Sequence, residues 1–228
     1  MAQSRLEFRI PVLKLLIGLL LTVIPISLAG LYTITASERS LDAVIGGYFK
    51  TIVAATAAEV SQYINDRVTG VAEISIDPAM VEAAQRANRA YVGMSEEAVT
   101  TRIKQIDQGW NGPPAEALVR DIMNSPASQL LRRLRTLDPR LLRITVTDER
   151  GATIAGTHKG LDYYQADEEY WQDIVAGGRG TVSLTDILFD EATNSNYIGI
   201  GMPIREEASQ RVIGTVDALV DLSSLLPL

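Results

Sequence analysis

The chain opens with a long uninterrupted apolar run. From Leu15 to Ser37 there are 23 residues without a single Asp, Glu, Lys or Arg. A helix of about 20 apolar residues is enough to cross the hydrocarbon core of a bilayer, which is about 30 Å thick. The run therefore predicts a transmembrane helix over residues 15–36. Pro25 is tolerated inside it, because helices buried in lipid accommodate proline.

Charged residues before this run orient the predicted span. Arg5, Arg9 and Lys14 outnumber Glu7, so residues 1–14 are expected to stay in the cytoplasm and residues after about 37 to lie outside it. The competing interpretation is a cleaved signal peptide, whose apolar region is usually about 7–15 residues long. The run is longer than that, and the small residues after it make weak cleavage sites. We therefore favour an uncleaved anchor.

A helical stripe follows the predicted span. Between residues 37 and 76 apolar side chains recur every three to five positions, which is the spacing of one helix face. They are Leu41, Val44, Ile45, Tyr48, Ile52, Ala55, Val60, Ile64 and Val68. A stripe of this length is typical of a packing face. It predicts one long membrane-proximal helix over 37–76 and, as a hypothesis, a homodimer formed along it.

Capping residues mark shorter helices in a helical segment over residues 77–140. Asp77-Pro78 and Ser125-Pro126 each place a capping side chain before a proline at the first helical position. Ser95 precedes two acids, which the helix dipole favours in a first turn. The stretch Trp110-Asn111-Gly112-Pro113-Pro114 predicts a break between helices.

The hydrophobic period changes from helical to alternating near residue 141. Leu142, Ile144 and Val146 alternate with polar residues, which predicts a half-buried strand. The predicted strands cover residues 141–147, 152–157, 181–186, 197–205 and 211–220, with a helix over 167–175 after the second. Short connections between consecutive strands favour an antiparallel sheet with a helix across one face, so the chain is predicted to be α+β.

Composition excludes several classes of function. The 228 residues carry a net charge of −7, which argues against nucleic acid because phosphate binding needs a basic face. Without cysteine the chain has no disulfide and no thiolate metal site. A single histidine, His158, leaves no His-pair zinc motif and little material for a Ser-His-Asp triad. No nucleotide-binding glycine motif occurs either. We therefore predict no cofactor, no metal and no enzymatic activity.

The candidate binding residues come from a cluster of aromatic and acidic side chains. Six of the 13 aromatic residues fall within residues 163–197, and residues 148–228 hold 14 acids against 5 bases. Aromatic rings form rigid pocket walls, and carboxylates beside them can hold an ammonium group. The alternatives are aromatic residues that only fill the core, an aspartate that only caps the Asn-rich turn, and a calcium site, which lacks the EF-hand spacing. The candidate ligand-binding residues are Tyr163, Tyr164, Glu168, Tyr170, Trp171, Asp186, Asp190 and Tyr197.

The order of these motifs resembles a known family. Residues 146–155 (VTDERGATIA), 162–171 (DYYQADEEYW), 199–204 (GIGMPI) and 212–216 (VIGTV) are similar to the turn, pocket helix and last two core strands of extracytoplasmic Cache sensor domains of bacterial receptors. The resemblance implies a PAS-like antiparallel sheet over residues 141–226. It also implies small-ligand sensing of the kind found in histidine kinases, chemoreceptors and cyclic-nucleotide enzymes, and a single-pass protein of the bacterial inner membrane.

Amino-acid-binding Cache domains add a more specific pattern. They have a tyrosine, an arginine five residues later, and two aromatic residues two and three positions after that arginine. Tyr163, Tyr170 and Trp171 fit this spacing, but Glu168 stands at the arginine position, while the aspartate that takes the ligand's amino group in the family falls on Asp190. The family's arginine grips the ligand's carboxylate. The reversed charge therefore predicts a ligand that is not a free amino acid and is cationic or neutral.

The leading interpretation is a membrane-anchored sensor module that binds a small ligand and passes the signal towards the membrane. Such receptors return to the cytoplasm through a second span. Residues 212–222 are too short for one and contain Asp217 and Asp221. We therefore expect a receptor fragment or a stand-alone module, with its cytoplasmic output domain or partner outside this chain. The alternatives are an anchored structural or interaction ectodomain without a ligand and, least favoured, a hydrolase using Asp186 and Asp190.

Overall fold

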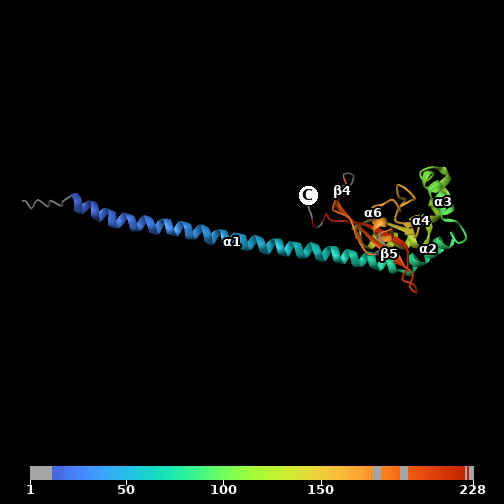
Figure 1. Ribbon diagram of the computed structural model, residues 1–228, viewed down its shortest axis with the longest axis horizontal. Coiled ribbons are helices and arrows are strands. Elements are labelled where there is room, and N and C mark those ends of the chain that lie inside the picture. The colour runs from blue at the N-terminus through green and yellow to red at the C-terminus, as the bar shows by residue number, and fades with distance from the viewer. Residues whose placement is uncertain (1–11, 177–180, 191–194, 224, 226–228) are drawn as a thin grey trace, which may run out of the picture. The chain divides into compact units, whose positions relative to one another are not determined.

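The computed structural model describes residues 12–176, 181–190, 195–223 and 225, without the side chains of residues 13, 43, 176 and 190 (Figure 1). The chain divides into two compact units, Met1–Glu59 and Val60–Leu228. Helix α1, Val12–Ile76, is 65 residues long and supplies the described part of the first unit and the start of the second. The fold is α+β, with a long helix, shorter helices and then a sheet, as predicted.

The first unit is a single helical segment within the described residues. It contains the apolar run and Pro25, and its large apolar side chains from Leu15 to Val53 are exposed. Within the described ranges, α1 is the helix that is long and apolar enough to cross a membrane, judged by length and composition. The long helix predicted over residues 37–76 is present as the later part of α1.

The second unit begins with the last turns of α1 and a series of short helices. These are α2 (Pro78–Arg89), α3 (Glu96–Gln108), the 3₁₀ turn η1 (Pro113–Ala115), α4 (Glu116–Asn124) and α5 (Pro126–Leu137). The predicted caps are confirmed: Asp77 accepts a hydrogen bond from the Ala79 amide at 2.8 Å, and Ser95 accepts one from Ala98 at 3.2 Å. The Ser125 hydroxyl likewise accepts from the Ser128 amide at 3.2 Å. These side chains stabilise the helix starts because the first amides of a helix have no intrahelical hydrogen-bond partner.

The sheet has six antiparallel strands among the described residues. They are β1 (Leu141–Asp148), β2 (Thr153–Gly156), β3 (Ser183–Leu184), β4 (Leu188–Asp190), β5 (Ser195–Arg205) and β6 (Val212–Asp221). Their spatial order is β2-β1-β6-β5-β3, and β4 also pairs with β5. Strand β4 is a correction, because the sequence pattern predicts no strand between residues 187 and 196. Its three residues are too few to show an alternating pattern, and only pairing with β5 makes them a strand.

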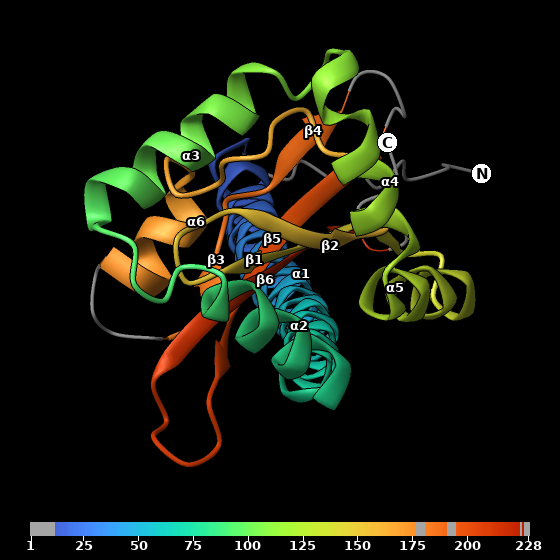
Figure 2. The same cartoon turned by 90° about the vertical axis from the view of Figure 1, so that its right-hand side faces the viewer.

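One face of the sheet packs against α1, α2 and α5. Ile144 and Val146 of β1 and Val216 of β6 are fully buried on it. They meet apolar side chains from the three helices, among them Val71, Met80, Ala84 and Leu131. In Figure 2 the helices α2 and α5 lie to the lower right of the diagonal strands and α3 lies to their upper left. Between β2 and β3 the chain forms α6 (Glu169–Trp171) and the π-helical turn η2 (Gln172–Ala176), whose residues Tyr170 and Ile174 pack on the opposite face at Gly201.

A second, smaller core lies among α3, α4 and the loop after β2. Its centre is Trp110, only 1% exposed, which stacks at a tilt on Tyr163 with ring centroids 5.2 Å apart. The Trp110 indole donates to the Gly160 carbonyl at 3.1 Å. The break predicted at residues 110–114 is thus also where a large side chain turns inward and holds the loop that carries Tyr163.

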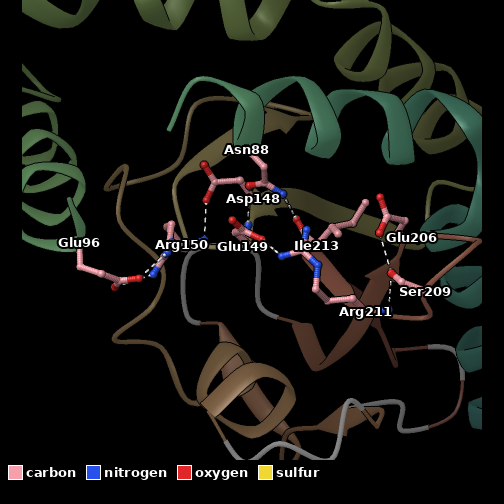
Figure 3. A network of polar contacts seen from close by, with 9 residues as sticks. All are labelled: Asn88, Glu96, Asp148, Glu149, Arg150, Glu206, Ser209, Arg211 and Ile213. Carbon is pink, nitrogen blue, oxygen red and sulfur yellow. Dashed lines mark hydrogen bonds and ion pairs between the residues drawn. The ribbon is translucent and has the colours of Figure 1, made fainter. Parts of the chain in front are cut away.

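A polar network joins the β1–β2 turn to its surroundings (Figure 3). The side chain of Asn88 on α2 accepts from the Glu149 amide at 3.2 Å and donates to the Ile213 carbonyl at 2.8 Å. Arg211 pairs with Glu149 at 2.6 Å, and Arg150 pairs with Glu96 of α3 through two bonds of 2.7 and 2.8 Å. The network ties the turn to α2, α3 and the β5–β6 hairpin, which positions the loop that follows β2.

Candidate functional site

The sheet face beneath α6 carries a buried carboxylate. Asp217 of β6 pairs across the ladder with Thr145 on one side and Gly201 on the other. Directly paired residues of an antiparallel sheet point to the same face. Asp217 therefore shares its face with Tyr170, which contacts Gly201. It is only 4% exposed, and no side-chain or backbone group among the described residues donates a hydrogen bond to its carboxylate.

The charge of Asp217 is weakly compensated. The nearest cation is Arg143, whose Nη2 atom is 3.9 Å from Asp217 Oδ2 and whose side chain is 35% exposed. Burial raises the pKa of Asp217 to about 6; the positive charge of Arg143 lowers it, and the negative charge of Glu168 raises it further. A buried carboxylate without good partners favours its neutral form or a cationic partner.

Helix α6 supplies the Tyr170 phenol. Tyr170 is 8% exposed and rests on Gly201, where a Cβ atom would lie 3.3 Å from Tyr170 Cβ and 3.0 Å from Ile174 Cδ1. Glycine at this position lets the helix approach the sheet. The Tyr170 hydroxyl donates to Gln165 Oε1 at 3.3 Å. Burial raises the pKa of the Tyr170 phenol, and the charges of Asp217 and Glu168 raise it further, so the phenol stays protonated.

Arg143, Glu168, Tyr170 and Asp217 together form what we call the α6 site. Burial, with the charges of Asp162 and Asp167, raises the pKa of Glu168, while Arg143 lowers it. Two carboxylates and one guanidinium leave the site negative when all are charged. Two buried donors, Arg143 Nε and Trp171 Nε1, have no hydrogen-bond partner in the part of the chain that the structure describes. Unpaired buried donors are costly unless a bound molecule or water satisfies them.

The structure separates the residues singled out from the sequence. Glu168 and Tyr170 belong to the α6 site, and Trp171 follows them in α6. Tyr163 does not face Asp217: it is 7% exposed and packs on Trp110 in the smaller core. Tyr164 is half-buried against the same core, and its amide, like that of Tyr163, donates to Asp107 Oδ1, at 3.0 and 2.8 Å.

The remaining candidates lie nearer the edge of the sheet. Asp186 is exposed in the connection between β3 and β4. Asp190 ends β4 opposite Ser195, and its side chain lies outside the described residues. Tyr197 shares the sheet face of Gly201, but four residues along β5 separate them by about 13 Å.

Sequence reasoning misses two residues of the α6 site. In the alternating pattern of apolar and polar residues, Asp217 and Arg143 appear only as polar positions within predicted strands. The sequence does hold one sign of Asp217, because this aspartate interrupts an apolar stretch of β6 at an inward position. That signal is weak without the pairing register, which decides whether a polar residue faces solvent, a helix or another charge.

A cavity lies away from the α6 site, and its lining includes none of the four residues of that site. It has a volume of about 970 Å³ and lies between the start of α2 and the β5–β6 hairpin. Pro78, Val81 and Met202 are among its lining residues, while its acidic residues Glu82 and Glu207 are exposed. Because it offers no buried charge to orient a ligand, the chemistry of the α6 site is the more specific.

Comparison with known proteins finds similar structures but no sequence match. No protein-family model matches the chain, and no curated protein matches it. The sensor domain of the V. cholerae histidine kinase DctB aligns with a TM-score of 0.48 at 11% identity, covering 81% of this chain and 58% of that one. The ligand-binding domain of the Pseudomonas aeruginosa amino acid chemoreceptor PctC, in complex with GABA, aligns with a TM-score of 0.46 at 11% identity, covering 78% and 62%.

A third structure is the ligand-binding domain of the Pseudomonas fluorescens chemoreceptor CtaA in complex with L-serine, with a TM-score of 0.46 at 14% identity, covering 82% of this chain and 62% of that one. The chain thus spans 58% to 62% of the length of these three structures. These three structures are the sensor domain of a histidine kinase and the ligand-binding domains of two chemoreceptors.

Proposed function

We propose that the chain is a membrane-anchored, extracytoplasmic sensor module that binds a small ligand at the α6 site and passes the signal towards the membrane as the input part of a receptor. The observation that carries this proposal is Asp217, a carboxylate 4% exposed whose nearest cation is 3.9 Å away. A purely structural sheet gains nothing from such a group, because burying an undercompensated charge costs stability. A binding site gains a strong partner for a ligand's cation.

The ligand we propose is cationic or neutral and is not a free amino acid. An ammonium or amidinium group would contact Asp217 and Glu168, with the Tyr170 ring beside it. Acceptor oxygens elsewhere on the ligand would take the unused donors Arg143 Nε and Trp171 Nε1. Arg143 is a single cation against two carboxylates, so the site favours a ligand with net positive charge.

A thermal-shift screen of the full chain in detergent micelles tests the proposal. A ligand present at 100 times its dissociation constant stabilises the folded state by about 2.7 kcal/mol. That gain raises the melting temperature of a domain of this size by roughly 5–10 °C. We expect shifts from small amines and amidines, such as butylamine, and these shifts should disappear in Asp217→Asn. A response to carboxylates alone would contradict the proposed ligand class.

A second candidate function is an anchored interaction ectodomain without a small ligand. It is favoured by one observation: the Tyr163 ring packs on Trp110 in the smaller core and does not belong to the α6 site. The same screen separates the two functions, since an ectodomain of this kind would respond to neither amines nor carboxylates. Both candidates are non-enzymatic.

The contacts at the end of β6 support a route for the signal. The strand that carries Asp217 ends at Asp221, whose carbonyl accepts a hydrogen bond from the Tyr63 hydroxyl of α1 at 2.9 Å. Arg67 of α1 pairs with Asp138, and its guanidinium lies 5.2 Å from the centre of the Tyr63 ring. A shift of β6 on ligand binding would therefore act directly on α1.

The exposed stripe on α1 supports the proposed homodimer. Val44 and Tyr48 are 67% and 66% exposed, and residues four apart share one face of a helix. The chain has no native cysteine, so single-cysteine variants report cleanly. In native membranes Val44→Cys and Tyr48→Cys should form disulfide-linked dimers on mild oxidation. Lys50→Cys, on the opposite side of the helix, should form several-fold fewer, and equal crosslinking at all three positions would contradict a seam along this stripe.

A further inference from the structure

A second cavity lies where α2, α3 and α4 meet the edge strand β2. Its volume is about 290 Å³. Ile103 and Ile106 of α3 and Leu118 and Ile122 of α4 form much of its apolar wall. Its lining includes no residue of the α6 site. We call it the α2–α4 cavity.

Tyr163 places an unused hydrogen-bond donor at this cavity. The side chain lines it and is 7% exposed, yet its hydroxyl makes no hydrogen bond with any described residue. The ring is held in place by Trp110, and the backbone amide by Asp107 at 2.8 Å. Burial raises the pKa of the phenol to about 12, so at neutral pH it is a protonated donor. The hydroxyl oxygen is not among the fully buried unpaired atoms of the described residues, so it is accessible at the cavity and can donate to a bound molecule or to water.

The charged groups of the cavity point to the sign of the ligand. Asp148 lines it, but its carboxylate already accepts from the Tyr91 hydroxyl at 2.6 Å and from the Arg150 and Ala152 amides at 2.8 and 3.0 Å. Asp148 is therefore not free to bind a cation. Arg102 also lines the cavity, and it makes no ion pair within the described part of the chain.

The groups left for a ligand are thus a cation, a neutral hydroxyl donor and an apolar wall. A guanidinium with a neighbouring hydroxyl binds a carboxylate well, because both donate to its oxygens. We propose that the α2–α4 cavity is a second ligand site, which takes a small carboxylate with an apolar body. An empty apolar cavity of about 150 Å³ holds benzene, so a cavity of about 290 Å³ has room for an aromatic carboxylate of the size of benzoate.

Ligand-observed ¹⁹F NMR with 4-fluorobenzoate and the full chain in detergent micelles tests this proposal. The variants are Arg102→Gln, which removes the cation from an exposed position, and Tyr163→Phe, which removes a hydroxyl without a partner and leaves the ring packing intact. Losing a charge-assisted hydrogen bond weakens binding by about tenfold or more. We expect that loss in Arg102→Gln and a several-fold loss in Tyr163→Phe. Melting curves identify any variant that has not folded.

The matched control is Asp217→Asn, which alters the α6 site only. It should bind fluorobenzoate as the wild type does, and 4-fluorobenzylamine should not compete at this cavity. No binding of fluorobenzoate at millimolar concentration would overturn the proposal and leave a cavity filled by water. Wild-type affinity in either Arg102→Gln or Tyr163→Phe, or a loss in Asp217→Asn, would also overturn it. These outcomes do not depend on whether amines bind at the α6 site, so the two proposals can be tested separately.

Discussion

Asp217→Asn is expected to stabilise the ligand-free protein by about 2–3 kcal/mol at pH 7.5 and to abolish its response to amines. The gain follows from the pKa of Asp217, which burial raises from an ordinary 3.8 to about 6. Each unit of pKa difference between folded and unfolded states is worth about 1.4 kcal/mol. Asparagine keeps the shape and removes the buried charge, so the folded state no longer carries this cost.

The pH dependence has a definite sign. Because the folded state holds the proton of Asp217 more tightly than the unfolded state, the stabilising contribution is fully present below about pH 4 and is lost as the pH rises through about 6. The melting temperature of the wild type should therefore fall between pH 4 and 7, and that of Asp217→Asn should fall less. The melting temperature of the variant should still fall somewhat with pH, because the pKa values of Glu168 and Asp148 are also raised. Tyr170 stays protonated throughout this range, because burial raises the pKa of its phenol.

Asp186→Asn is the matched control for this experiment. It removes the same charge from the same half of the chain, but from an exposed position. Surface changes of this kind are usually worth less than about 0.5 kcal/mol. Equal melting temperatures for wild type and Asp217→Asn at pH 7.5, or an amine response that survives the substitution, would contradict the role proposed for Asp217.

Gly214→Ala is expected to destabilise the protein by about 3 kcal/mol or more, which lowers the melting temperature by roughly 6–12 °C. A Cβ atom at this position of β6 would overlap the Thr147 carbonyl oxygen and would lie 3.4 Å from Ala84 Cβ of α2. The overlap is with backbone, and β1 and β6 are paired along seven positions here, so neither side can move away cheaply. The added methyl would also disturb the neighbouring bond from Asn88 to the Ile213 carbonyl.

Gly70→Ala supplies the control for this substitution. Gly70 lies in α1, and a methyl group added there would have no atom within 4 Å beyond its own stretch of helix. Alanine is favoured over glycine in a helix by about 0.5–1 kcal/mol. The full chain in detergent micelles should therefore melt slightly higher with Gly70→Ala and much lower with Gly214→Ala. If Gly214→Ala has the same melting temperature as the wild type, the β1–β6 pairing is looser than the structure indicates.

The helices and most strands of this protein could be predicted because their signals are local. Asp77, Ser95 and Ser125 satisfy amides two or three residues away, so short stretches of sequence are enough to place the helix starts. The alternation along β1 and β6 likewise reflects a sheet with one apolar face. Strand β4 has no such pattern in its three residues and exists only through pairing with β5.

The sequence by itself determined the apolar run, the order of the elements apart from β4, and the presence of Tyr170 in a short helix after the second strand. Only the tertiary structure decided that Tyr163 packs in a core beside Trp110 and that Arg143 and Asp217 lie under α6. The physical reason is range. Caps and periodicity act within a few residues, whereas the neighbours of a buried charge are set by strand register between residues 74 positions apart in the chain, as for Arg143 and Asp217.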